Sequence, residues 1–313
     1  MPSTLTLPVP RNLSLPHTVC SYGYFILAPN RWTPVDKPFL GRFIRPLRLP
    51  DNTVVNVTVS QPKPAAPLRV RCDRTLDRPG RDAVRRQLAR ILRLDENLDA
   101  FHTLHPAARR ARFARLFRSP TLFEDIVKTM TSCNVTWPST VRMNRLLVAE
   151  PGCGLDFPTP DELAPWRPDR LARRCKVGYR AERIIRLARD VARSRLNLDE
   201  LEDPALPTTD LYERLIAIHG IGPFAANNIL QLLGRYDRLA VDSETLRHFR
   251  QVHGVHGDLK KVTRLAHRHY NRYAPYQFLA YWFELWGHYE GRQRQAWKWK
   301  ESSYEAFTAR NMK

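Results

Sequence analysis

Residues 211–242 read LYERLIAIHGIGPFAANNILQLLGRYDRLAVD, and this stretch decides the fold of the larger part of the chain. Apolar residues recur at helical spacing over residues 211–218, residues 219–222 form a turn that contains two glycines, and residues 223–233 predict a second helix. Two helices joined by so short a turn form a helix-hairpin-helix.

The turn of this hairpin has the composition of a phosphate-binding loop. Gly220 and Gly222 permit a positive φ and a close approach of the backbone to an anion, and Pro223 suits the first helical position. The N–H groups at the start of the second helix then face that anion. We therefore predict that Gly220, Ile221 and Gly222 contact the DNA backbone without reading its sequence, although a plain pair of packed helices has the same pattern.

A carboxylate follows the hairpin at a fixed spacing. Asp242 stands 20 residues after Gly222, directly before a predicted helix over residues 243–252. An aspartate in this place is an ordinary helix N-cap, because its side chain accepts from the first N–H groups. It can be catalytic as well, since those N–H groups and the helix dipole keep the carboxylate ionised.

The charge of the chain points to a polyanionic partner. Lys and Arg number 51 against 31 Asp and Glu, which gives a formal net charge of +20 and a pI near 10.3. Clustered cations that neutralise phosphates release counterions, so nucleic acid is the leading candidate, while charge that only solubilises the surface is the alternative. We expect no membrane contact, because no apolar run approaches the length of a membrane span.

The chain predicts an α+β fold. Short strands are expected at residues 24–27, 54–59 and 68–71, and almost all later apolar patterns have a helical period. We therefore expect a small antiparallel β-rich N-terminal domain with a trailing helix over residues 1–100, followed by a helical domain over residues 101–313.

The hairpin with its carboxylate resembles the helix-hairpin-helix, Gly/Pro-Asp superfamily of base-excision DNA glycosylases. Residues 122–137, 178–189, 211–249 and 281–291 each look like segments of 8-oxoguanine or 3-methyladenine glycosylases. The resemblance implies an enzyme that flips a damaged or modified base from duplex DNA and hydrolyses its N-glycosidic bond. Asp242 would then be the catalytic group, stabilising positive charge on the sugar and orienting water.

The resemblance also bears on lyase activity. Bifunctional members carry a Lys two residues after the second hairpin glycine, where it forms a Schiff base, and this chain has Phe224 there. No Lys occurs between Lys176 and Lys260, so the expected product is an intact abasic site. A non-catalytic DNA-binding protein and a glycosylase with lyase activity from a Lys elsewhere stay open as alternatives.

Further DNA contacts are implied by the resemblance alone. Tyr179 would wedge into the base stack, Arg180 would contact the opposite base, and Asn134 would fill the gap left by the extruded nucleotide, unless it is a helix cap. The expected base pocket comprises Phe224, Gln295, Trp297 and Trp299. The aromatic run over residues 281–286 is assigned to the core instead.

Cofactors and setting follow from the cysteines and the resemblance. Five cysteines form no CxxC pair and none lies beyond Cys175, so neither a disulfide framework nor a cysteine-ligated zinc or iron–sulfur site is indicated. We expect no catalytic cofactor, but a structural Na⁺ or K⁺ on the carbonyls of Ile216, Ile218 and Ile221. The expected protein is a monomer in the cytoplasm, nucleoid-associated if bacterial; the excised base is open among alkylated, oxidised, deaminated and bulky viral forms.

Overall fold

The computed structural model describes residues 2–35, 41–113, 115–292 and 294–299, which form two compact units. The sheet unit contains residues 2–35, 41–96, 115–198 and 294–299. The hairpin unit contains residues 97–113 and 199–292. Each unit therefore draws on separate stretches of the chain.

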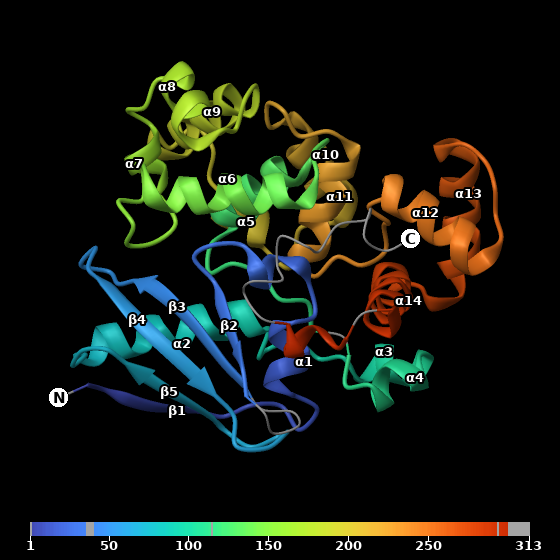
Figure 1. The fold of residues 1–313 in the computed structure, drawn as a ribbon, viewed down its shortest axis with the longest axis horizontal. Helices are drawn as coiled ribbons and strands as arrows, with labels where there is room; N and C mark the ends of the chain where they lie inside the picture. Colours follow the sequence, from blue (N-terminus) through green and yellow to red (C-terminus); the bar gives the residue numbers. More distant parts are fainter. Residues whose placement is uncertain (1, 36–40, 114, 293, 300–313) are drawn as a thin grey trace. The chain divides into compact units, whose positions relative to one another are not determined.

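A five-stranded antiparallel sheet belongs to the sheet unit (Figure 1). Burial alternates along its strands, so one face packs on the core. In spatial order the strands are β1 (Thr4–Leu7), β5 (Leu68–Cys72), β4 (Val54–Ser60), β3 (Gly41–Arg48) and β2 (Arg31–Pro34).

The predicted strands are right in two of three places. Residues 54–59 and 68–71 lie in β4 and β5, but the strand expected at residues 24–27 is wrong. That segment is the fully buried 3₁₀ helix η1 (Gly23–Ile26), because a short apolar run without alternation fits a buried helical turn as well as a strand.

The sequence does not predict strand β3, because a proline, Pro46, breaks the pattern typical of a strand. Pro46 pairs with Asn56 of β4, whereas the pairing with β2 ends at Ile44. The missing N–H of Pro46 therefore costs no ladder hydrogen bond on the β2 side, which is how a proline is tolerated within a strand.

Helices complete the sheet unit. The longest, α2 (Arg78–Leu92), begins at the N-cap Asp77 and buries Val84, Leu88 and Ile91, and its Gln87 donates to a carbonyl of β3. The others are α1 (Leu15–Val19), α5 (Leu122–Ser132), α6 (Trp137–Ala149), α7 (Pro160–Leu163), α8 (Pro168–Cys175), α9 (Arg180–Ala192) and the 3₁₀ helix η4 (Ala296–Lys298).

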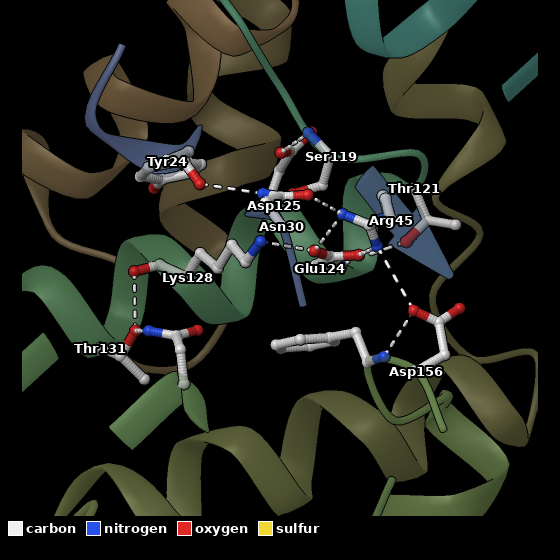
Figure 2. Close-up of polar contacts among 12 residues, drawn as sticks. Tyr24, Asn30, Arg45, Ser119, Thr121, Glu124, Asp125, Lys128, Thr131 and Asp156 are labelled. Atoms are coloured by element: carbon white, nitrogen blue, oxygen red, sulfur yellow. Dashed lines mark hydrogen bonds and ion pairs between the residues drawn. The ribbon is translucent and has the colours of Figure 1, made fainter. Parts of the chain in front are cut away.

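A buried set of charges joins the sheet to α5 (Figure 2). Arg45 of β3 makes a bidentate pair with Glu124, with nitrogen to oxygen distances of 3.1 and 2.6 Å, and lies 3.5 Å from Asp156. The ammonium of Lys128 lies 2.6 Å from Glu124, and the side chains of both Arg45 and Lys128 are fully buried. Burial acts to raise the pKa of Glu124, but Arg45 and Lys128 together lower it to about 2.

The hairpin unit is helical throughout its described residues. Its elements are α3 (Asp99–Leu104), α4 (Pro106–Arg110), η2 (Asp199–Glu202), α10 (Thr208–Ala217), α11 (Pro223–Leu232), α12 (Ser243–His253), α13 (Leu259–Tyr270), η3 (Asn271–Tyr273) and α14 (Gln277–Arg292). The helices predicted from residues 211, 223 and 243 onward are confirmed. Rings of Phe278, Trp282 and Trp286 stack along α14, which confirms the packing role of this aromatic run.

The α+β class is confirmed: an antiparallel sheet near the N-terminus precedes a helical body. The predicted domain boundary between residues 100 and 101 separates strands from helices. The compact units divide the chain differently, because helices α5 to α9 belong to the same unit as the sheet. The predicted boundary therefore stays a prediction. None of the helices in the described ranges is both long and apolar enough to cross a membrane.

Candidate active site

The turn between α10 and α11 uses its two glycines differently. Gly220 has a φ of +90°, the left-handed conformation that the sequence predicts. Gly222 has a φ of −99° with an extended ψ, so it does not use the positive φ that glycine permits. A Cβ at this exposed position would meet no protein atom within 4 Å, so the protein itself leaves this side of the turn open.

The start of α11 presents backbone donors. Gly222 is the N-cap and offers no side-chain acceptor, and Pro223 occupies the first turn. The first intrahelical bond runs from the Ala226 N–H to the Gly222 carbonyl, so the N–H groups of Phe224 and Ala225 precede the helical ladder. Uncapped N–H groups at the positive end of a ten-residue helix favour an anion.

Asp242 caps α12 through one carboxylate oxygen. Its Oδ1 accepts from the N–H groups of Glu244 at 3.0 Å and Thr245 at 3.1 Å, and the Thr245 hydroxyl accepts in return from the Asp242 N–H at 3.2 Å. No hydrogen bond to Oδ2 is made by any described residue. The cap therefore leaves one oxygen for a substrate or a water molecule, and capping and catalysis do not compete for the same atom.

The environment of Asp242 favours the neutral acid more than the sequence suggests. Burial raises the pKa of Asp242 from 3.8 to about 6, while the hydrogen bonds from Thr245 and Glu244 act to lower it. The expected effect of the cap is thus present, but desolvation outweighs it. At pH 7, above this pKa, the ionised carboxylate is the main form.

Two residues that the sequence did not single out for function support Asp242. Thr245 completes the capping box, and its hydroxyl lies 2.9 Å from the hydroxyl of Tyr281 on α14. The capping-box spacing could have indicated Thr245. Nothing in the sequence pattern separates Tyr281 from its aromatic neighbours: it is buried as predicted, yet it also holds the side chain that holds Asp242.

The hairpin and the segment before Asp242 are joined directly. Asn227 of α11 donates to the Leu239 carbonyl at 3.1 Å, which ties the second hairpin helix to the connection that leads into α12. Phe224 is half-buried in the first turn of α11, on the same helix. The hairpin unit therefore contains the glycine turn, Phe224 and Asp242 on consecutive, connected elements.

Tyr179 and Asn134 both lie in the sheet unit, and both contact Arg180. Tyr179 is 54% exposed, and Asn134 is exposed with a φ of +52° between α5 and α6. Arg180 links them, because it is adjacent to Tyr179 and donates to the carbonyls of Met130, Cys133 and Asn134. Asn134 is not a helix cap, since Cys133 caps α5 and α6 begins from its own N-cap Thr136.

The position of Arg180 does not suit its predicted contact with a base. Its side chain is 5% exposed and its guanidinium is occupied by backbone carbonyls. A base contact would require this guanidinium to leave the turn. Arg180 instead fixes the turn that carries Asn134 beside the exposed ring of Tyr179, which also lies against Arg183.

The predicted pocket residues near the C-terminus pack within the sheet unit. Trp299 is buried against Phe25, with ring centroids 6.0 Å apart, and the ring of Trp297 lies 4.6 Å from that of His17. Gln295 is exposed at the start of η4. Trp299 therefore contributes to packing, whereas Trp297 is only half-buried, and a role of either residue in a base pocket stays a prediction.

Comparison with solved structures shows what the fold is. The 8-oxoguanine glycosylase/lyase of Clostridium acetobutylicum in its apo form has a TM-score of 0.65 and 16% identity, over 91% of this chain and 96% of that one. The same enzyme with double-stranded DNA containing cytosine opposite 8-oxoG has a TM-score of 0.64 and 15% identity, over 92% and 98%. The 3-methyladenine DNA glycosylase of Archaeoglobus fulgidus has a TM-score of 0.61 and 20% identity, over 88% and 97%.

Sequence comparison adds nothing to this result, because no protein-family model and no curated protein matches the chain. The structural likeness nevertheless extends over 88–91% of this chain and 96–97% of the other chains. This chain therefore has the fold of the 8-oxoguanine and 3-methyladenine DNA glycosylases, the fold that the hairpin and its carboxylate predict.

Proposed function

We propose that this protein is a monofunctional DNA glycosylase that removes a damaged or modified base from duplex DNA and leaves an abasic site. One observation carries the proposal: Asp242 begins a helix 20 residues after the hairpin turn and keeps one carboxylate oxygen open, within the fold of known DNA glycosylases.

The chemistry assigned to Asp242 uses the two oxygens separately. Departure of the base leaves positive charge on the sugar, and a fixed negative charge beside it stabilises the transition state. Oδ1 is held by the cap, so the carboxylate cannot rotate freely, and Oδ2 is available to orient the attacking water. Partial burial strengthens the attraction between the ionised carboxylate and the positive sugar, because little water screens it.

Binding to DNA is supported by charge and by the turn. The net charge of +20 attracts the phosphate backbone, and the open N–H groups at the start of α11 suit one phosphate. In the sheet unit, Tyr179 and Asn134 share one exposed region, as a wedge and a gap-filling residue would have to. The substrate of the proposed enzyme is therefore a duplex with an extruded base.

The absence of lyase activity is proposed from the lysines. Phe224 stands where the resemblance places the Schiff-base Lys, and no Lys follows until Lys260. Lys128 is buried and desolvated as a nucleophilic amine would be, but it lies 2.6 Å from Glu124 in a fully buried pair. An amine bound in this way cannot reach a sugar, so water remains the nucleophile.

A structural monovalent cation at the hairpin stays part of the proposal. Helix α10 ends at Ala217, so carbonyls of its last turn, including that of Ile216, lie beyond the helical ladder. The Ile218 carbonyl accepts from the Ile221 N–H at 3.0 Å and retains a second lone pair. The carbonyls of Ile216, Ile218 and Ile221 are suitable donors for Na⁺ or K⁺, and such an ion would stiffen the turn.

The test is a panel of duplexes, each with a single alkylated, oxidised, deaminated or bulky modified base. We expect alkali-dependent strand breaks on at least one duplex, and Asp242→Asn should lower base release about 100- to 1,000-fold while DNA binding is kept. Asp77→Asn, which alters the exposed N-cap of α2, is the matched control and should release the base normally.

Each alternative has its own signature in this assay. Base release by Asp242→Asn at the wild-type rate would remove Asp242 from the chemistry. DNA binding without release from any duplex would favour a non-catalytic binding protein. A covalent adduct after borohydride treatment of the wild-type protein on cleaved DNA would show a Schiff base and contradict the monofunctional assignment.

A further inference from the structure

Two helices of the hairpin unit bring two histidines and a glutamate together, and a third helix adds a tyrosine hydroxyl. His248 and His253 lie on α12 and Glu284 lies on α14. The Nε2 atoms of His248 and His253 are 2.7 and 2.6 Å from the same Glu284 oxygen, Oε1. One ligand atom from each of the three residues lies within 4.8 Å of the others. The hydroxyl of Tyr270, from α13, donates to that oxygen at 2.9 Å.

This cluster is more crowded than hydrogen bonding alone requires. Three groups converge on Oε1, although a carboxylate oxygen has two lone pairs in its plane. The second oxygen, Oε2, meets only the more distant Nε2 of His269, at 3.9 Å, among the contacts of the described residues. Two imidazole nitrogens and a carboxylate oxygen held this close together form a set of ligands that a bound cation would organise.

The donor set selects the kind of cation. Two imidazole nitrogens and one carboxylate oxygen suit a divalent transition metal, whereas Mg²⁺ and Ca²⁺ prefer oxygen ligands throughout. Zinc binds at about 2.0–2.2 Å to such atoms in a tetrahedral arrangement. Ligand atoms then stand roughly 3.3 Å apart, so the histidine and glutamate atoms would separate by less than ~1 Å. His269 lies outside this group of three, with its Nε2 3.9 Å from Oε2, and would have to move inward to become a fourth ligand.

A route from solvent reaches the cluster. A cavity of about 440 Å³ is lined by His253 and His269, together with Arg268 and Arg272. The side chains of His253 and Glu284 are 19% and 32% exposed, while that of His248 is fully buried. A hydrated cation can therefore enter from the His253 side and meet the buried nitrogen last. The two arginines oppose its entry by charge repulsion.

We propose that His248, His253 and Glu284 bind one Zn²⁺ ion, with His269 or water as the fourth ligand. The ion would have a structural role: it fastens α12 to α14 near the C-terminal end of α12. Asp242 caps the opposite end of the same helix, and Tyr281 of α14 contacts its capping partner Thr245. The metal would thus stabilise the pair of helices that holds the carboxylate. The proposal does not depend on the glycosylase function, because metal binding is measured without DNA.

The experiment measures metal binding by full-length protein without an affinity tag. After treatment with a chelator and dialysis, the protein is titrated with Zn²⁺ by calorimetry, and Co²⁺ is added separately to record the visible spectrum of a tetrahedral site. A Cys153→Ser background removes an exposed thiol that also binds zinc. We expect one equivalent of Zn²⁺, a tetrahedral Co²⁺ spectrum and a higher melting temperature with zinc than without it.

Variants decide whether these residues are the ligands. Glu284→Gln and His253→Gln should each weaken Zn²⁺ binding more than about 100-fold, since even groups behind the ligands contribute about 10- to 100-fold. His253 ends α12 and is partly exposed, so its variant folds even if Glu284→Gln does not. His267→Ala, at an exposed histidine of α13 outside the cluster, is the control and should keep full binding.

Two results would overturn the proposal. The first is that the Cys153→Ser protein, with His248, His253 and Glu284 all present, binds no zinc. The second is one equivalent of zinc bound with unchanged affinity by folded His253→Gln, which would place the metal elsewhere. Failure of base release on every duplex would leave both metal readouts intact, so the two proposals fail separately.

Discussion

Replacing Asp242 by Asn should stabilise the protein while it lowers base release about 100- to 1,000-fold. The pKa of Asp242 is raised from 3.8 to about 6, chiefly by burial. A rise of this size corresponds to about 3 kcal/mol at pH 7, because each tenfold change in the acid constant is worth about 1.4 kcal/mol. Residual solvent screening at this partly exposed side chain and the lost attraction to the helix N-terminus reduce the gain. We expect about 1–2 kcal/mol.

The gain depends on pH in a defined direction. The folded protein holds the Asp242 proton more tightly than the unfolded chain, so the wild type loses stability as pH rises from about 4 to about 6. Asp242→Asn has no such proton. The difference between the two proteins should grow over this interval and stay constant from pH 7 to 9. Base release under kcat/KM conditions should rise between about pH 5 and about pH 7, with a midpoint near pH 6, because the ionised form is the active one.

Chemical denaturation at a series of pH values measures the difference, and scanning calorimetry should show a melting temperature about 2–6 °C higher at pH 7. Asparagine caps helices about as well as aspartate, so the cap itself is kept. An Asp242→Asn variant that is less stable than wild type at pH 7 would refute the reasoning, since the charge would then stabilise the folded state. Asp77→Asn at the exposed cap of α2 should show no gain that grows between pH 4 and 6.

Four further substitutions test the site. Gly222→Val should keep the fold, because its Cβ meets no protein atom, and should raise the Kd for every duplex roughly tenfold at fixed salt, the cost of one charge-assisted contact. Phe224→Lys should yield a weak borohydride-trapped adduct that the wild type lacks. Tyr281→Phe removes the hydroxyl partner of Thr245 and should lower kcat by at most about tenfold with KM unchanged. Tyr179→Ala should leave unfolding within about 0.5 kcal/mol of wild type but weaken base flipping, measured by the fluorescence of a 2-aminopurine reporter.

The helical part of the fold was predictable because local signals agree there. The glycine turn, Pro223 and the apolar spacing all indicate the same hairpin, and the capping position of Asp242 follows from its place before α12. The sheet was harder to predict from the sequence. Pro46 and the arginines at every third position of β3 conceal a strand whose buried charge, Arg45, is neutralised by a partner 79 residues later in the sequence. Only the tertiary structure supplies that partner.

The difference between local signals and long-range contacts also decides which residues of the site can be predicted. Thr245 lies within the local capping pattern, whereas Tyr281 acts through a contact 36 residues away. Arg180 shows the converse: a contact with a base is expected from the sequence, yet carbonyls about 50 residues away in the sequence hold its guanidinium in a buried position. The packing of Trp299 on Phe25 likewise joins residues from opposite ends of the chain. Residues whose role depends on long-range contacts are those that pattern alone misplaces.

The buried charges around Glu124 have an evolutionary consequence. Removing one partner of a buried ion pair costs about 3–5 kcal/mol, a large part of the 5–15 kcal/mol that keeps a typical domain folded. Arg45, Lys128 and Asp156 therefore cannot drift independently, and their substitutions should be strongly epistatic. Lineages are expected to inherit the set as a block or to exchange it as a block for apolar side chains. The whole set is therefore a sharper mark by which to compare sequences than any one of its residues.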